Sequence, residues 1–319
     1  MGVDADGARI LLGLVNAGAA RDSLLTIGRM QLFAKPSSLL SMVQEYSFAK
    51  GGASFANGAY AEEFFSLLGF KQTHSLDISD FEGCTFVHDM NLPIPEHFKN
   101  YYDVVFDGGT LEHVYNFPMA LENCLAMVKG GGHFVTIGPA NNCCGHGFYQ
   151  FSPELYYTAL RAAGFVVREM IMIERRGRQT RWYSVANPSI LQSRINLHNR
   201  YPVYLSVVAQ KGGECGERAR APQQSDYVAA WENAPVTSQS SGWPSRIRSL
   251  LYRLVPSLGS RCELAYHQHW ISSFRNRRVY TPIEQRGFVV RRFIGCHYIR
   301  ACALLRYASL KLINHPCHV

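Results

Sequence analysis

The stretch that most constrains the fold is Tyr101–Ile137, which has the pattern of a strand, a helix and a second strand in close succession. Tyr102–Asp107 is a nearly uninterrupted apolar run that ends in an acid and two glycines, typical of a strand buried on both faces. Asn116–Val128 carries apolar residues at the spacing of an amphipathic helix, which the KGGG of residues 129–132 is expected to end. His133–Ile137 follows as the next strand. Such units are right-handed and parallel, and they predict a doubly wound, mostly parallel α/β sheet.

Composition limits the classes of protein to which the chain can belong. With 319 residues, 47% of them hydrophobic and 18% charged, it can bury a large core and is not a disordered protein. A net charge of +8 would suit an acidic partner, but the arginines form short scattered clusters without a nucleic-acid-binding motif, which argues against nucleic acid. Nine cysteines, an odd number without CxxC spacing, predict a reducing, cytoplasmic location.

The apolar segments do not indicate a membrane protein. No run approaches the roughly twenty apolar residues that cross a bilayer, so no membrane span is expected. Ala8–Ala20 superficially resembles the core of a signal peptide, but Asp4 and Asp6 precede it and the start is not basic. We expect this segment to be a first helix packed on the sheet.

Three predicted strands end in an acid: Thr73–Asp77, Cys84–Asp89 and Tyr102–Asp107. Because ligands of doubly wound sheets bind beyond the carboxyl ends of the strands, these acids are expected to line one site. Carboxylates there would accept hydrogen bonds from the hydroxyl and amino groups of a nucleoside-like ligand. Each acid taken singly is also explained as a cap on the turn that follows it.

The predicted first central strand, Ser23–Gly28, is followed by an unusual turn. A dinucleotide-binding fold normally places several glycines here, whereas this chain continues Arg29-Met30-Gln31 and has no GxGxxG. The missing motif argues against an enzyme that uses a nicotinamide cofactor.

A long polar loop at residues 138–151 precedes a helix start at Ser152-Pro153. His146 lies between two glycines of this loop, and His113 follows the strand that ends at Asp107, so both histidines are candidate bases. For His113, a hydrogen bond that braces the turn is an equally good explanation. Cys143-Cys144 and His146 lack the spacing of a closed zinc site, and no metal site is expected.

At this point the chain resembles a known family. The DVVFDGGTLEHV segment, the helix that ends in VKGGGHFV, and the order of the acids resemble class I S-adenosylmethionine-dependent methyltransferases. More narrowly, SLDIS, HDMNLPIP and GHGFYQFSPEL resemble a bacterial group described only as methyltransferase-domain proteins. The resemblance covers about Ser23 to Gln210. It implies a seven-stranded, Rossmann-like sheet and S-adenosylmethionine as the cofactor.

The resemblance implies roles for individual residues on the adenosine side of this cofactor. Asp77 matches the acid that accepts both ribose hydroxyls, a role that needs an ionised carboxylate. Ile78 matches the residue that packs on the adenine face, and Asp89 matches the acid that accepts from the adenine amino group.

On the methionine side, the resemblance places Gly28 at the end of the first strand. The fourth-strand turn under the methionine and sulfonium is matched by Asp107, Gly108, Gly109 and Thr110. The chain differs from the family at the turn after the first strand, where Arg29 and Gln31 stand in place of the usual acid and glycines of the family's first motif. These two side chains are expected to hold the methionine carboxylate through charge-assisted hydrogen bonds, unless the fold has lost its cofactor.

The sequence predicts a Rossmann-like methyltransferase domain over residues 1–210, a linker or loosely packed crossing over 211–243, and a helical appendage over 244–319. Phe165–Glu174 and Tyr201–Ala209 are expected to close the sheet as an antiparallel hairpin at its edge. In the appendage, helices are predicted over Arg246–Leu254 and Arg261–Phe274. The pattern leaves open whether the appendage folds back on the main domain or forms a homodimer surface.

Two functions remain after the nicotinamide enzyme is set aside. The first is a methyltransferase for a small molecule or glycan, acting at oxygen or nitrogen by aligned displacement, with His146 or His113 as general base. The second is a non-catalytic, methyltransferase-like binding or assembly protein, which the altered first motif and the long appendage favour. The sequence does not identify the methyl acceptor.

Overall fold

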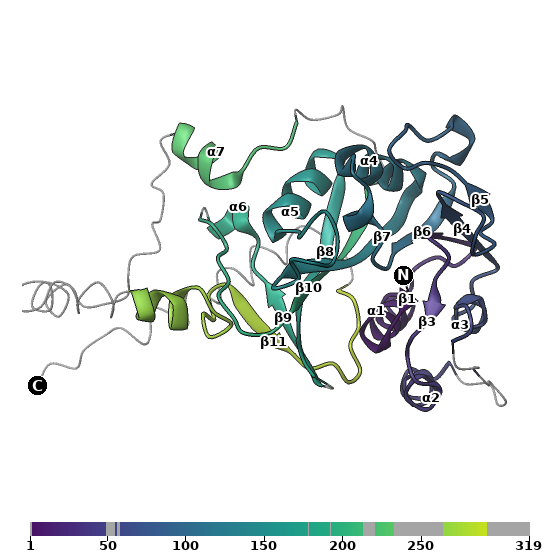
Figure 1. The fold of residues 1–319 in the computed structure, drawn as a ribbon, viewed down its shortest axis with the longest axis horizontal. Coiled ribbons are helices and arrows are strands. Elements are labelled where there is room, and N and C mark those ends of the chain that lie inside the picture. Colours follow the sequence, from purple (N-terminus) through teal and green to yellow (C-terminus); the bar gives the residue numbers. More distant parts are fainter. Residues whose placement is uncertain are drawn as a thin grey trace, which may run out of the picture.

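A mixed sheet of nine strands runs through the described part of the chain, in the order β11-β9-β8-β10-β7-β6-β2-β4-β5 (Figure 1). The structure is a computed structural model, and it describes residues 2–48, 55, 58–177, 179–191, 193–212, 221–232 and 264–291. Helices cover both faces of the sheet (Figure 1). The predicted α/β class is confirmed.

The parallel half of the sheet comprises β2 (Ser23–Ile27), β4 (Gln72–Asp77), β5 (Phe86–Val87), β6 (Tyr102–Asp107) and β7 (Val128–Asn141). From β2 the chain moves outward to β4 and β5, and it then returns to place β6 and β7 on the other side of β2. The strand order therefore reverses between β2 and β6. Crevices at such a reversal are where open α/β sheets bind ligands.

The other half of the sheet is antiparallel and differs from the prediction. β10 (Val203–Lys211) lies between β7 and β8 (Phe165–Arg176) and is antiparallel to both. The expected hairpin partners therefore pair, but not at the edge, because the arginine-rich excursion forms β9 (Gln179–Val185) and β11 (Tyr280–Ile283) covers β9. The sheet has nine strands in the described residues instead of the seven expected.

Alternating strand residues build two core layers. Leu24, Val104 and Phe106 belong to the layer under α1, α2 and α3, whereas Leu25 and Val105 belong to the layer under α4 and α5. Every residue of β2 and β6 is buried, as expected for strands covered on both faces. The bounds of these helices are α1 Ala5–Asn16, α2 Pro36–Glu45, α3 Glu62–Leu67, α4 Phe117–Met127 and α5 Pro153–Ala162.

Short elements complete the described chain. Two short strands, β1 and β3, pair in parallel outside the main sheet. No helix among the described residues is long and apolar enough to span a membrane. The remaining bounds are β1 Gly2–Val3, β3 Gln31–Leu32, α6 Pro188–Leu191, α7 Ser225–Trp231, the 3₁₀ turns Glu96–Phe98 and Leu111–His113, and the π-helical turn His267–Ile271.

Both predicted helix boundaries are confirmed. α5 begins as expected, because Ser152 caps it by accepting a hydrogen bond from the Leu155 amide at 3.2 Å. α4 ends at Met127, as the sequence predicted, and residues 129–132 belong to β7, which begins at Val128 and not at His133. A side chain at Gly132 would lie 2.8 Å from the Asp103 carbonyl oxygen. Gly132 therefore allows the close approach of β6 and β7.

The described part of the predicted appendage folds back on the sheet. The ring of Phe274 stacks on Tyr183 at 4.0 Å, and the ring of Phe288 meets Trp182 edge-on at 5.3 Å. Arg291 pairs with the buried Glu169 at 2.8 Å. The helix predicted over Arg246–Leu254, most of the predicted linker and the expected dimer surface beyond residue 291 lie outside the described residues.

Candidate functional site

The ends of β2, β4 and β6 meet at the reversal of strand order. The amide of Gly28, directly after β2, donates to the Leu76 carbonyl in β4 at 2.7 Å. Gly28 has a φ of +79° and Gly109, after β6, has a φ of +101°, a backbone conformation that favours glycine. These two glycines begin the turns after β2 and β6. Because β4 and β6 both run parallel to β2, the acids that end them lie at the same edge of the sheet.

Asp77 lies at this edge, and one of its carboxylate oxygens can accept hydrogen bonds from a ligand. Its Oδ1 accepts from the Ile78 amide at 2.7 Å, and within the described ranges no hydrogen bond reaches Oδ2. The neighbouring Ile78 side chain is 64% exposed, which is unusual for a large apolar group. A free carboxylate oxygen beside an exposed apolar surface fits the hydroxyls of a ribose and the face of a base.

Asp89 is engaged with its own turn. Its Oδ1 accepts from the backbone amide of Asn91 at 2.9 Å and from the Asn91 side chain at 2.7 Å. The backbone hydrogen bond, followed by that from the side chain, lowers the pKa of Asp89. Asp89 therefore caps the turn that follows it, which is the alternative to ligand binding that the sequence left open for each acid.

Asp107 holds the turn after β6 from below. Its side chain is wholly buried, and Oδ1 accepts from the Thr110 amide at 2.8 Å while Oδ2 accepts from the Thr136 hydroxyl at 2.7 Å. Burial raises the pKa of this carboxyl, against the lowering effect of the hydrogen bonds. Both carboxylate oxygens of Asp107 therefore accept hydrogen bonds from the protein, and these bonds stabilise the turn.

The residues that replace the glycine-rich motif pack over this turn. Met30 is 2% exposed, and its sulfur lies 3.0 Å from the position that a Cβ of Gly108 would take. The amide of Gly2 approaches the Gly108 carbonyl at 3.4 Å, and β1 pairs with β3, which contains Gln31. The turn is therefore covered by the Met30 side chain and the first residues of the chain.

Arg29 is held by protein groups. Its Nε donates to Glu62 Oε1 at 2.8 Å, and Nη1 donates to the Glu82 carbonyl at 2.7 Å. Its guanidinium also lies 3.8 Å from the ring centroid of Tyr60. Arg29 therefore connects the start of α3 to the loop after β4, and its expected contact with a methionine carboxylate would require it to exchange partners.

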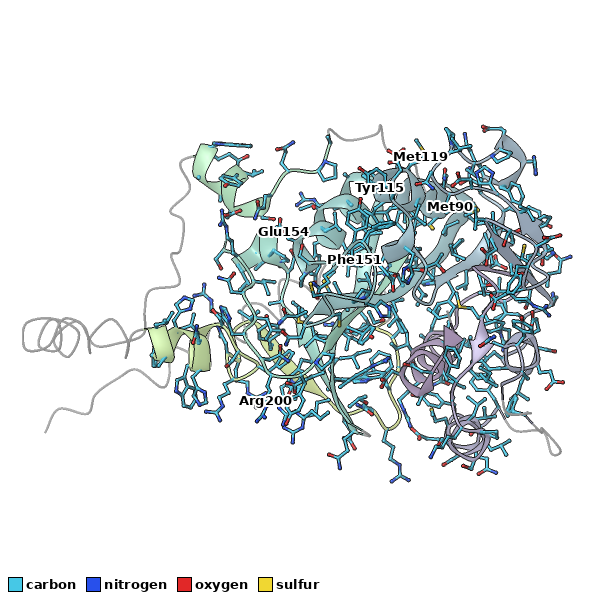
Figure 2. All side chains as sticks on the ribbon, in the orientation of Figure 1. Met90, Tyr115, Met119, Phe151, Glu154 and Arg200 are labelled. Atoms are coloured by element: carbon cyan, nitrogen blue, oxygen red, sulfur yellow. The ribbon has the colours of Figure 1, made fainter. Side chains whose placement is uncertain are left out.

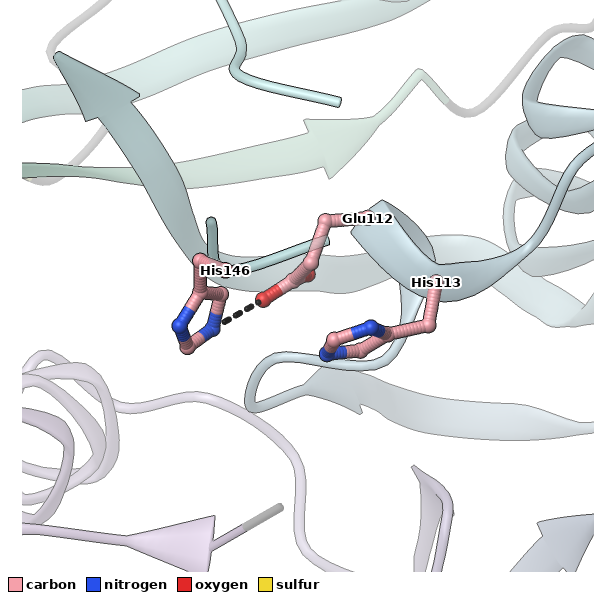
Figure 3. Close-up of side chains that lie close together, drawn as sticks. All are labelled: Glu112, His113 and His146. Atoms are coloured by element: carbon pink, nitrogen blue, oxygen red, sulfur yellow. Dashed lines mark hydrogen bonds and ion pairs between the residues drawn. The ribbon is translucent and has the colours of Figure 1, made fainter. Parts of the chain in front are cut away.

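Glu112, His113 and His146 form a second group beside the turn (Figure 3). Glu112 and His113 belong to the 3₁₀ turn after β6, whereas His146 comes from the long loop after β7. The Glu112 carbonyl accepts from the amides of Phe148 at 2.8 Å and Tyr149 at 3.3 Å, which holds the loop over the turn. The carboxyl Oε1 of Glu112 then lies 3.1 Å from His146 Nε2.

Burial gives this group unusual electrostatics. The Glu112 side chain is wholly buried, and its Oε2 is without a hydrogen-bond partner among the described residues. Desolvation, together with the nearby Asp107, raises the pKa of Glu112 to about 8. Desolvation, followed by His146, lowers the pKa of His113. Glu112 therefore holds a proton near neutral pH more readily than an ordinary glutamate, at a distance where it can share it with His146.

The sequence predicted both histidines near the site, and it favoured a turn-bracing or cofactor-side role for Glu112 over that of a base. The backbone of Glu112 braces the turn, and its side chain contacts His146. The adjacent His113 was the only local signal of this contact. Two exposed aromatics nearby, Tyr115 and Phe148, have ring centroids 5.9 Å apart (Tyr115 is labelled in Figure 2).

The aromatic side chains at the end of the long loop and in α5 differ in burial. Phe151 and Tyr156 are buried in the core layer under α4 and α5, with ring centroids 5.5 Å apart. Tyr149 is half-buried and donates its hydroxyl proton to the Tyr115 carbonyl at 2.6 Å. Phe151 and Tyr156 are thus core residues.

No protein-family model and no curated protein sequence matches the chain. Solved structures similar to it include S-adenosylmethionine-dependent methyltransferases. A putative one from Listeria monocytogenes is 12% identical, with a TM-score of 0.38 over 65% of this chain and 98% of that one. The 1,6-didemethyltoxoflavin-N1-methyltransferase of Burkholderia thailandensis, solved with S-adenosylhomocysteine, is 14% identical, with a TM-score of 0.35 over 65% and 79%.

A [4+2]-cyclase, SpnF, is also similar, at 14% identity and a TM-score of 0.37 over 66% of this chain and 81% of that one. The similar structures thus differ in the reaction that their names give. At these scores the likeness carries no argument about function, and the strand order described above is what defines the fold of this chain.

Proposed function

We propose that this chain is an S-adenosylmethionine-dependent methyltransferase that acts on a small molecule or a glycan, at oxygen or nitrogen. The observation that supports it best is the placement of Asp77, with a carboxylate oxygen to offer, beside Gly28 at the reversal of strand order. A nucleoside with two vicinal hydroxyls is the ligand class that suits such a carboxylate. The free thiols of the described cysteines support a cytoplasmic location.

The proposed cofactor side uses residues of three strand ends. Asp77 accepts the ribose hydroxyls, and the exposed Ile78 packs on the adenine face. Gly28 and Gly109 let the backbone approach the ligand. The cofactor supplies a methyl group on a sulfonium, and the protein's task is alignment.

The proposed acceptor side is the group around Glu112. His146 takes a proton from the acceptor hydroxyl or amine, and Glu112 orients its ring through the 3.1 Å contact. His113 lies beside it, with the two ring centroids 5.5 Å apart, and is the second candidate base. The exposed rings of Tyr115 and Phe148 offer apolar surface to the acceptor.

A specific observation favours a second candidate, a non-catalytic binding protein of the same fold. Met30 and Gly2 pack on Gly108, where the family resemblance expects backbone open to the methionine part of the cofactor. Arg29 is also committed to Glu62 and to the Glu82 carbonyl. A protein that had lost the cofactor would tolerate these contacts.

Turnover separates the two candidates. The purified chain is incubated with methyl-labelled S-adenosylmethionine and a panel of phenols, amines, hydroxy acids and oligosaccharides, and release of S-adenosylhomocysteine is measured. We expect acceptor-dependent release that falls at least tenfold in His146→Gln and persists in His97→Gln, because His97 is exposed on a turn after β5. Cofactor binding without turnover on any acceptor would favour the non-catalytic candidate.

A further inference from the structure

Glu112, His113 and His146 present three donor atoms to one point. One ligand atom from each residue lies within 4.8 Å of the other two. The residues come from two segments, and the loop that carries His146 is fastened to the turn by the hydrogen bonds to the Glu112 carbonyl. Figure 3 shows the two rings and the carboxyl turned toward the same space.

The carboxyl of Glu112 is incompletely satisfied in this arrangement. It is wholly buried, and its Oε2 is without a hydrogen-bond partner among the described residues. Buried polar atoms without partners are rare in folded proteins and call for an explanation, of which an ion is one. A cation at this point would compensate the burial of the carboxylate.

We propose that Glu112, His113 and His146 bind a divalent first-row transition metal, with zinc as the best match. Two imidazoles and one carboxylate suit such metals, whereas magnesium prefers a shell of oxygen atoms. Bond lengths of about 2.0 Å in a tetrahedral site place neighbouring ligand atoms roughly 3.3 Å apart. Glu112 Oε1 and His146 Nε2 already lie 3.1 Å apart. The half-exposed His146 and the exposed His113 can adjust by ring rotation.

Three protein ligands leave an open position for an oxygen or nitrogen of a small molecule. In the proposed methyltransferase this position would take the acceptor hydroxyl, and the metal would lower its pKa so that the proton leaves to solvent. With the metal bound, His146 is a ligand and replaces the general base proposed above. Only this last step rests on the proposed function. Metal binding is measured without methyl transfer.

The test is metal binding to chelator-treated full-length protein. Calorimetry with zinc, and the visible spectrum of added cobalt, are expected to show one equivalent bound with imidazole ligation. Affinity should fall at least tenfold in His146→Gln and in Glu112→Gln, and remain unchanged in His97→Gln. Magnesium should not displace cobalt. His113→Gln provides a further variant if Glu112→Gln does not fold, as judged by circular dichroism.

Three outcomes would overturn the proposal. Folded wild-type protein that binds neither metal would do so, as would binding that survives all three ligand variants. Loss of binding in Cys143→Ser or Cys144→Ser, with the histidine variants unaffected, would assign the metal to the thiols. Zinc binding in a protein that does not bind S-adenosylhomocysteine would leave this site standing while removing the proposed function.

Discussion

Burial changes the proton affinity of single residues far from the candidate site, and His133 in β7 is the clearest example. Its side chain is 9% exposed, and Nδ1 makes no hydrogen bond among the described residues. Desolvation, followed by the nearby Arg168, lowers the pKa of His133 from 6.5 to about 4. The unfolded chain therefore binds a proton more readily than the folded chain over this pH range.

This shift predicts that the protein loses stability as the pH falls below about 6.5. Between pH 7.5 and 5, His133 alone should lower the free energy of unfolding by about 2 kcal/mol, since each pKa unit corresponds to about 1.4 kcal/mol. Urea unfolding at the two pH values measures the change. His133→Leu removes the titrating group, so its loss over the same interval should be smaller by that amount. An equal loss in the variant would contradict the assignment.

The contact between Glu112 and His146 shows what residue-level reasoning from sequence can and cannot find. His113 was predicted near the site because it follows the strand that ends at Asp107, and His146 because it lies between two glycines of the long loop. The contact between Glu112 and His146 depends on how the loop at residues 142–151 folds over the turn. The separation of the two residues in the sequence does not indicate this contact. A search of short spacings around Cys143 and Cys144 therefore did not find the group that the fold brings together, Glu112, His113 and His146.

At the scale of elements, the sequence predicted features that have local signals and did not predict the pairing of strands that are distant in the chain. The buried strands β2 and β6 and the capped start of α5 were predictable because their signals are local. The antiparallel edge was not, because β9 pairs with β11 from almost a hundred residues later. The end of α4 before residue 129 was predicted, but the strand begins at Val128 and not at His133, since a need for close approach between strands also selects glycine.

The close approach at Gly132 has a measurable consequence. A Cβ there would lie 2.8 Å from the Asp103 carbonyl oxygen and 3.0 Å from a Val128 methyl group. We expect Gly132→Ala to lower the free energy of unfolding by about 1–3 kcal/mol, the usual cost of overpacking. Gly145→Ala is the matched control, because nothing lies within 4 Å of its Cβ position. Chemical denaturation compares the two, and equal stabilities would show that the strands can separate without cost.

At the scale of the whole molecule, the reversal of strand order between β2 and β6 organises the candidate site. It brings Gly28, Asp77 and the Asp107 turn to one edge of the sheet, as the sequence predicted from the acids at the strand ends. The same edge also carries Met30 on Gly108, which the sequence indicated only as an altered motif. The proposed function therefore requires that this edge of the sheet bind a nucleoside.

Calorimetric titration of S-adenosylhomocysteine into the full-length protein tests this requirement most directly. We expect saturable binding at one site, weakened at least tenfold, or about 1.4 kcal/mol, in Asp77→Ala because the ribose hydroxyls lose their acceptor. Asp80→Ala, an exposed acid in the same loop, should bind as the wild type does, and NAD should not bind. A folded protein that shows no heat with S-adenosylhomocysteine, or that binds it equally well without Asp77, would contradict the central claim.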